Sequence, residues 1–356
     1  MLKESWKESI DRYNAFWSGE PLDRPPVIID TVKGYGNPTF NGVGYDYIKY
    51  GEDIVKLRND VYSMWEKRYN FSDDSIPCIA PIYGNVFEAA LFMGEIVWGR
   101  EVTELKPHNP AEDIKSIDEI MFDKSNKYYQ KLLDDVTFLS KHAATDYGVC
   151  YDGGMSITTA ISQLLGGTRF MFDLYDDPDG IRHFAEHVTD ILISLHSKVN
   201  ELTPKPAGGS CHRWINYWNP GRGFWFSEDD AIMMSPEMYR EIFLDLDVKL
   251  CASTDMPALH WHTAGLHLIP ELIKIDNLKM IQLAPDPNGP GFDEILEFCK
   301  IIVASDIRVC FQMGYDQDKV RKIFNTLPSD SCLFYLSYAD SFCEANRILI
   351  EIEKMA

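Results

Sequence analysis

The C-terminal part of the chain alternates between short apolar runs and longer amphipathic segments, and this pattern restricts the fold more than any other feature. Four units follow one another, with predicted strands at 258–262, 280–284, 308–312 and 332–338 and predicted helices at 266–275, 292–303, 316–327 and 342–354. Strands joined through helices run parallel, because each helix carries the chain back to the start of the sheet. The pattern therefore predicts an α/β fold with a parallel sheet.

Shorter apolar runs nearer the N-terminus extend this sheet. They lie at 27–30, 76–80, 149–152 and 214–218 and bring the predicted strands to eight. Residues 95–105 alternate like a β-hairpin with its turn near Gly99. We predict one domain over residues 1–356, a (β/α)8 TIM barrel with N-terminal helices, a helical extension at 1–25 and a small β-hairpin insertion. An open doubly wound sheet is the alternative, but the glycines between 31 and 44 lack the spacing of a phosphate-binding turn.

Charge and cysteine usage exclude several classes of partner. The formal net charge is −21, from 55 acidic and 34 basic residues, which disfavours both nucleic acid and anionic membranes. No apolar run approaches the roughly 20 residues that a membrane span requires. The eight cysteines are scattered through apolar runs, as in proteins of a reducing cytoplasm. We therefore expect a cytoplasmic protein with a small-molecule substrate.

Two histidines stand at the end of the strand predicted at 258–262. His260 and His262 are two residues apart, so in a strand their side chains point to the same face. The C-terminal ends of barrel strands are where such folds carry their chemistry. Two converging imidazoles suit a metal ion, whereas the simpler interpretation is a pair of hydrogen-bonded structural side chains.

Four segments of the chain resemble the uroporphyrinogen decarboxylase superfamily, which includes corrinoid-dependent methyltransferases that carry zinc in the same barrel. Asp23-Arg24-Pro25-Pro26 matches a loop of that group, and the glycines at 153–154 and 166–167 are similar to its strand-to-helix turn. The run from Glu228 to Tyr239 resembles a segment that ends in "LSPExY". His260-Trp261-His262 stands where the methyltransferases have His-x-Cys before a turn.

Departures from the family pattern bear on the substrate and on the metal. True decarboxylases bind the substrate carboxylates with arginines after the first strand, whereas residues 30–35 contain none, so uroporphyrinogen III is not the expected substrate. The second zinc cysteine of the methyltransferases corresponds to Asp340, so the resemblance implies a zinc site of His260, His262 and Asp340. Iron would also accept these ligands. In a second register the family motif falls on residues 262–265, Ala264 replaces the cysteine, and most of the site is lost.

Acidic and aromatic residues near the predicted strand ends complete the candidate site. Asp30 and Asp152 end predicted strands, and Glu228 lies with Asp229 and Asp230 in a loop at the same rim. We predict catalytic roles for Asp30, Asp152 and Glu228, although acids in loops are often solvated helix caps. Aromatic residues could line a pocket or fill the core; we predict substrate contacts for Tyr217, Trp218 and Trp261, from a wider set with Trp214, Phe224 and Trp225.

Two functions remain open at this point. The first is a metal-assisted methyltransferase, in which zinc activates an acceptor thiol and the methyl group comes from a corrinoid on a partner protein or from another small donor. The second is a metal-free decarboxylase, another lyase or a small-molecule-binding member of the same superfamily. The metal content of the purified protein distinguishes them.

Overall fold

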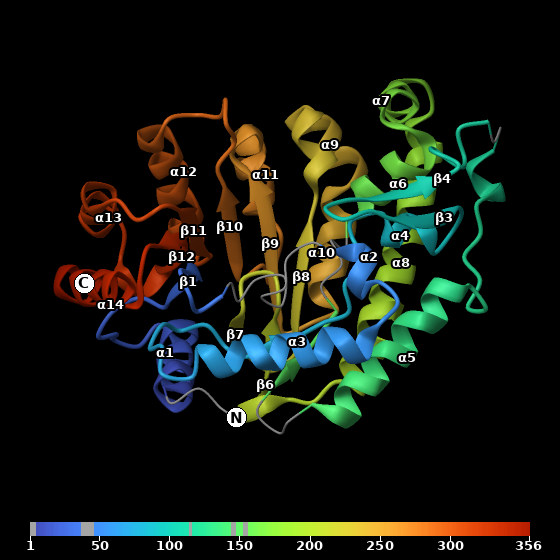
Figure 1. Cartoon of the computed structure of the whole chain (residues 1–356). Coiled ribbons are helices and arrows are strands. Elements are labelled where there is room, and N and C mark those ends of the chain that lie inside the picture. Colours follow the sequence, from blue (N-terminus) through green and yellow to red (C-terminus); the bar gives the residue numbers. More distant parts are fainter. Residues whose placement is uncertain (1–4, 37–45, 114–115, 144–146, 152–155) are drawn as a thin grey trace.

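A curved parallel sheet forms the centre of the molecule (Figure 1). The computed structural model describes residues 5–36, 46–113, 116–143, 147–151 and 156–356. All six strands of the sheet are parallel to their neighbours, and their order is β1 (Val27–Val32), β12 (Cys332–Ala339), β11 (Arg308–Met313), β10 (Met280–Ala284), β9 (Met256–His262) and β8 (Gly223–Ser227). The parallel α/β prediction is confirmed.

The predicted closure of the barrel is wrong for the described residues. Two further strands, β2 (Cys78–Ile79) and β5 (Gly148–Val149), pair in parallel with each other but form no ladder with the six-stranded sheet. The edge of β1 shows why. The backbone N–H groups of Val27 and Ile29 donate to the carboxylates of Asp74 and Asp73, at 2.8 and 3.0 Å, so side chains satisfy groups that a neighbouring strand would otherwise bind.

The strand predicted at residues 214–218 is replaced in the sheet by β8, at residues 223–227. Tyr217–Pro220 forms β7, which is antiparallel to β6 (Gly209–His212). The backbone of Asn216 has φ of 52°, in the left-handed region, so the predicted strand is broken at its centre. Residues 214–218 and 223–227 are both rich in aromatic residues, and the alternation of apolar side chains alone does not show which of the two segments joins the sheet.

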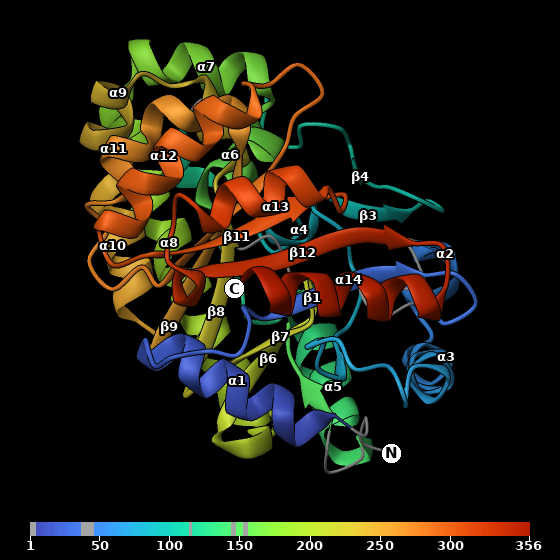
Figure 2. The same cartoon turned by 90° about the vertical axis from the view of Figure 1, so that its left-hand side faces the viewer.

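Helices cover the outer side of the sheet, as the turned view shows for α12 to α14 (Figure 2). The helices are α1 (Trp6–Ser18), α2 (Tyr47–Tyr50), α3 (Ile54–Lys67), α4 (Phe87–Ala90), α5 (Lys127–His142), α6 (Ile157–Leu165), α7 (Gly167–Asp176), α8 (Pro178–Leu202), α9 (Pro236–Ile242), α10 (Leu244–Ala252), α11 (Ile269–Leu272), α12 (Phe292–Ala304), α13 (Gln317–Phe324) and α14 (Phe342–Met355). Short 3-10 turns include η4 (Asp229–Met233) and η5 (Thr263–Leu268). None of these helices has both the length and the apolar character needed to cross a membrane.

Local signals in the sequence explain several helix starts. Asp177 accepts a hydrogen bond from the Gly180 N–H ahead of α8, and Ser341 accepts one from Glu344 N–H at the start of α14. Ser5 precedes α1 but makes no side-chain cap. The predicted hairpin is confirmed as β3 (Glu95–Trp98) and β4 (Thr103–Lys106).

Alternation along the strands separates two buried clusters. On β9, Ala258 belongs to the cluster inside the sheet, with Met280 of β10, whereas Leu259 and Trp261 belong to the larger cluster between the sheet and the helices. His260 and His262 share the face of Ala258 because side chains alternate along a strand. The strand therefore directs both imidazoles to the inside of the curved sheet.

Candidate metal centre and its pocket

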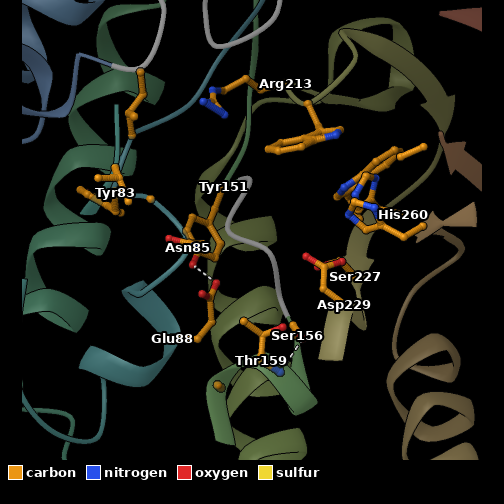
Figure 3. Close-up of a pocket in the computed structure, with 18 of the residues that line it drawn as sticks. Tyr83, Asn85, Glu88, Tyr151, Ser156, Thr159, Arg213, Ser227, Asp229 and His260 are labelled. Carbon is orange, nitrogen blue, oxygen red and sulfur yellow. Dashed lines mark hydrogen bonds between the residues drawn. The ribbon is translucent and has the colours of Figure 1, made fainter. Parts of the chain in front are cut away.

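The inner face of the sheet opens into a pocket of about 520 Å³ (Figure 3). His260 and His262 line it from the end of β9, and Ser227, the last residue of β8, lies beside His260 in the register of the sheet. His260 is 8% exposed, and its ring centroid is 5.1 Å from that of His262. The two histidines therefore converge at one end of the pocket, as the sequence predicted.

The hydrogen bonds of the two histidines fix which ring nitrogen is free. The Nδ1 atom of His260 is bound by the side-chain oxygen of Gln282, whose amide nitrogen donates to Gln312 Oε1 at 2.6 Å. The Nδ1 atom of His262 lies 2.7 Å from Asp286 Oδ1. Both partners are oxygen acceptors, so each Nδ1 carries the proton and each Nε2 keeps its lone pair. Nε2 is thus the ligand atom that each histidine offers.

Asp286 is itself held by the turn that follows β9. Its Oδ2 accepts hydrogen bonds from Ala264 N–H at 2.7 Å and from the Thr263 hydroxyl at 3.2 Å. Burial alone would raise the pKa of Asp286, but the hydrogen bonds from Ala264 and His262 lower it below its ordinary value. Burial lowers the pKa of His260, which favours the neutral imidazole that binds metals.

Asp229 supplies the carboxylate of the candidate metal centre. One ligand atom from each of Asp229, His260 and His262 lies within 4.8 Å of the others, the only such group of three among the described residues. Asp229 Oδ1 is buried and accepts no hydrogen bond. A buried carboxylate oxygen without a hydrogen bond is costly, and a cation bound by Asp229 and the two histidines would reduce that cost. The residues present therefore fit a divalent metal.

Glu228, predicted as catalytic, holds a helix instead. It is fully buried, and its carboxylate accepts hydrogen bonds from the Ile157 and Thr158 N–H groups, at 2.8 and 2.9 Å, and from the Thr158 hydroxyl at 2.5 Å. These bonds tie the end of β8 to the start of α6. The side chains of these two adjacent residues point in different directions: Glu228 points to the start of α6, and Asp229 points to the histidines.

The other sequence candidates lie apart from this cluster. Asp340 precedes α14, and its N–H donates to Glu344 Oε2 at 2.6 Å. Asp340 is not in the group of three possible metal ligands, in which Asp229 supplies the carboxylate. Asp30 is half-buried on β1, near Arg68, and does not line the pocket. Asp152 lies outside the described residues.

The three predicted substrate-contacting aromatics are core residues. Tyr217 stacks on His212 at 4.7 Å, and the Trp218 indole N–H donates to the Pro206 carbonyl at 2.9 Å. Trp261 points to the opposite face of β9 from the histidines and is fully buried. Trp214 and Trp225, members of the wider set, line the pocket in their place, with ring centroids 5.7 and 6.3 Å from that of His260.

Several residues of the site were missed although the sequence carries a signal for them. Gln282, a polar residue inside an apolar strand, and Asp286, which follows the end of that strand, bind the two histidines. Glu88 interrupts an apolar run, Arg213 precedes an aromatic run, and both line the pocket. Polar residues in an apolar context favour a functional role when they line a cavity or hold residues that do.

Comparison with known proteins identifies a shared fold. No protein-family model and no curated protein sequence matches the chain. A solved structure, a methyltransferase from Methanosarcina mazei, superposes with a TM-score of 0.66 at 13% sequence identity, over 97% of this chain and 98% of that one. The two proteins therefore have the same fold over nearly their whole lengths.

Proposed function

We propose that this protein is a methyltransferase whose pocket holds a divalent transition metal, zinc by preference, on His260, His262 and Asp229. The methyl acceptor is a thiol. The donor is a corrinoid carried by a partner protein or another small methyl compound. The fold shared with the Methanosarcina mazei methyltransferase supports the reaction class, and the metal is inferred from the residues of this chain.

The grouping of the three ligands carries the proposal. One ring nitrogen of each histidine and one carboxylate oxygen of Asp229 lie within 4.8 Å of one another, and the partners of both Nδ1 atoms are already in place. Three protein ligands with a fourth position left for substrate are typical of catalytic zinc sites. Outer hydrogen bonds such as those that the two histidines donate to Gln282 and Asp286 fix imidazole rings in metal sites.

The surroundings of the ligands suit a reaction that must exclude water. Trp214 and Trp225 lie beside His260, which is 8% exposed. A zinc ion, when bound, would lower the pKa of an acceptor thiol so that the thiolate forms at neutral pH. One carboxylate and one thiolate together balance the charge of a divalent ion, so the substrate would complete the neutrality of the site.

Elemental analysis tests the metal. Protein purified without chelator should contain about one zinc ion per chain. The His260→Ala/His262→Ala double variant and Asp229→Asn should lose most of it. Asp230→Asn, a neighbouring acid outside the ligand group, and Asp340→Asn should keep it. Little metal in the parent, or equal metal in the parent and the double variant, would rule out the metal centre. If Asp340→Asn lost the metal and Asp229→Asn kept it, the third ligand would be Asp340, as the sequence suggested.

A spectroscopic assay tests the reaction. Methylcobalamin is supplied as the methyl donor and 2-mercaptoethanol as the acceptor thiol, and demethylation is followed by the absorbance of the corrinoid. The zinc-loaded protein should accelerate demethylation, and the double histidine variant should not. Acceleration that is equal in both proteins would contradict a role for the metal centre in methyl transfer.

A further inference from the structure

Three residues line the pocket in a row across the C-terminal ends of neighbouring strands. His262 of β9 lies beside Ala284 of β10 in the register of the sheet. The register between β10 and β11, continued by one residue, places Gln312 on the other side of Ala284. All three residues line the pocket. Neighbouring strands are about 4.8 Å apart, so the strands of His262 and Gln312 are roughly 10 Å apart. The small side chain of Ala284 takes up little of the space between them.

A chain of hydrogen bonds connects Gln312 to the metal centre. His260 donates from Nδ1 to the side-chain oxygen of Gln282, which is fully buried. The amide nitrogen of Gln282 donates in turn to Gln312 Oε1 at 2.6 Å. A glutamine side chain has one oxygen and one NH2 group, so Gln312 keeps its NH2 group for another acceptor. No acceptor for this group is found among the residues that the structure describes.

The metal centre sets the direction of this chain. A metal ion on Nε2 of His260 would leave the ring proton on Nδ1, which can then only donate. Gln282 must meet that proton with its oxygen, so its NH2 group is directed to Gln312, and the oxygen of Gln312 accepts. The NH2 group of Gln312 is therefore a hydrogen-bond donor of the pocket in the form of the protein that holds the metal.

The lining residues at the ends of β10 and β11 are uncharged. They are Ala284, Pro285 and Gln312. An anion that leaves water needs a counter-charge, whereas an uncharged oxygen needs only a hydrogen-bond donor. The net charge of −21 also disfavours an anionic ligand. This part of the lining therefore suits an ether or carbonyl oxygen better than a carboxylate.

We propose that Gln312 selects the acceptor thiol by donating a hydrogen bond to an uncharged oxygen of that molecule. The inference rests on the proposed function, in which the thiol sulfur takes the open position on the metal. The carbon chain of the thiol would then pass over Ala284 and bring an ether or carbonyl oxygen to the NH2 group of Gln312. The substrate class is therefore a thiol with a neutral oxygen acceptor a few atoms from sulfur, rather than a plain alkyl thiol or a thiol with an anionic end.

Calorimetric binding of matched thiols to the zinc-loaded protein tests the inference. In two pairs an ether oxygen replaces one methylene group: 2-methoxyethanethiol is compared with 1-butanethiol, and 3-methoxypropane-1-thiol with 1-pentanethiol. The ratio of the ether affinity to the alkyl affinity is measured in the parent and in Gln312 variants, because the change in that ratio cancels the different hydrophobicity of the two thiols. Loss of the Gln312 donor should lower the ratio at least about fivefold in one pair or in both.

Two substitutions separate the donor from other roles of the side chain. Gln312→Glu keeps an oxygen for Gln282 and removes the NH2 group, so it should keep its zinc and lower the ratio. Gln312→Leu removes the NH2 group without adding a charge, and it should lower the ratio as well. Gln317→Glu, the same change at an exposed position, should alter neither zinc content nor ratio. An unchanged ratio in both folded Gln312 variants would contradict the inference.

An anionic thiol tests the class of acceptor. 3-Mercaptopropanoate is similar in size to 2-methoxyethanethiol but ends in a carboxylate, and it should bind the parent more weakly, since the lining residues beside Gln312 offer it no counter-charge. Tighter binding of 3-mercaptopropanoate than of either ether would overturn the assignment of an uncharged oxygen.

The zinc content separates this inference from the proposed function. A protein that holds zinc and binds the thiols with the same ratio in the parent and the Gln312 variants would keep the metal centre and reject the role of Gln312. A protein without zinc whose ratio still depends on Gln312 would reject the metal centre and keep the hydrogen-bond donor.

Discussion

His260 and His262 both donate from Nδ1, but their acceptors differ in charge. Gln282 is neutral and buried, whereas Asp286 carries a carboxylate whose pKa is lowered by the hydrogen bonds that it accepts. An anionic partner makes an imidazole a stronger ligand, since it stabilises the positive charge that the ring gains on binding a cation. The two histidines are therefore unequal, and His262 depends on Asp286 for its orientation and for the strength with which it would bind a cation.

The substitution Asp286→Asn tests this dependence. The amide oxygen can still accept from His262, but the charge is lost, so we expect zinc affinity to fall about 10- to 100-fold without unfolding. Competition with a chromophoric chelator measures the affinity. Asp276→Asn, at an exposed position, removes a charge elsewhere and serves as the control. Equal zinc affinities for Asp286→Asn and Asp276→Asn would show that Asp286 has no role in the metal centre.

Among single residues, the convergence of the two histidines was predictable from the sequence, but the carboxylate that forms the group of three with them was not. The pair follows from local spacing, because residues two apart on a strand share a face. The choice among Glu228, Asp229 and Asp230 depends on how the chain turns after β8, and Glu228 is drawn away by the start of α6. That contact joins residues about 70 positions apart, so no local pattern contains it.

At the scale of elements, the β3–β4 hairpin contributes Glu101 and Val102 to the pocket and is held against the loop before α4. Gly84 has φ of 78°, and a Cβ atom there would lie 2.0 Å from Thr103 Oγ1. Thr103 is 2% exposed. The absence of a side chain at Gly84 therefore permits the close approach of the hairpin.

Gly84→Ala should displace the hairpin. We expect a loss of about 2–4 kcal/mol in the free energy of unfolding, from the left-handed backbone together with the clash. Gly34→Ala is the matched control, since Gly34 has φ of 88° but no atom within 4 Å of its Cβ position. It should cost about 1 kcal/mol. Denaturant unfolding measures both, and adding Thr103→Ala should restore part of the loss. Equal costs for the two glycines would mean that the contact with Thr103 is unimportant.

Two buried acids interact electrostatically: Glu228 directly precedes η4, and Asp247 lies on α10. Burial raises the pKa of Asp247 to about 7, although the hydrogen bond from the Tyr239 hydroxyl opposes this. Burial and the nearby Asp247 also raise the pKa of Glu228. The folded protein thus favours protonated Asp247 more than the unfolded chain does, where the pKa is 3.8. The contribution of Asp247 to stability is complete below about pH 4 and is lost as the pH rises through about 7.

The variant Asp247→Asn cannot ionise, and its amide oxygen can still accept from Tyr239. We expect it to be more stable than the parent at pH 8, on the order of 1–3 kcal/mol, with a smaller difference at pH 5. Thermal unfolding at the two pH values measures this. Asp276→Asn should show no such change with pH. If Asp247→Asn were stabilised relative to the parent more at pH 5 than at pH 8, the pKa of Asp247 would not be raised in the folded protein.

At the scale of the whole molecule, the parallel α/β architecture was predictable from the sequence, but whether the strands close into a barrel was not. The four C-terminal units are separated by clear changes from strand to helix periodicity, and each strand pairs with its neighbours in parallel. Closure depends on β2 and β5, which are two residues long. It also depends on Asp73 and Asp74, whose carboxylates bind the N–H groups of β1. Such a contact between a loop side chain and a strand edge has no periodic signature.

The charge of the whole molecule and of the pocket bears on one substrate that the resemblance raised. Uroporphyrinogen III carries carboxylates around its entire ring, and each needs a cationic or hydrogen-bonding partner when it is bound. The described pocket lining offers Arg213, but it also presents Glu88 and Asp229. The chain as a whole has a net charge of −21, which repels a polyanion at long range.

We therefore expect no decarboxylation of uroporphyrinogen III above the uncatalysed rate when the protein and the substrate are incubated anaerobically and the products are separated by chromatography. Raising the ionic strength would screen the long-range repulsion but would not supply the missing counter-charges, so it should not produce turnover. A true uroporphyrinogen decarboxylase assayed in parallel shows that the substrate is intact. Turnover at a comparable rate would mean that residues outside the described pocket lining bind the carboxylates, and it would favour the decarboxylase alternative over the methyltransferase proposal.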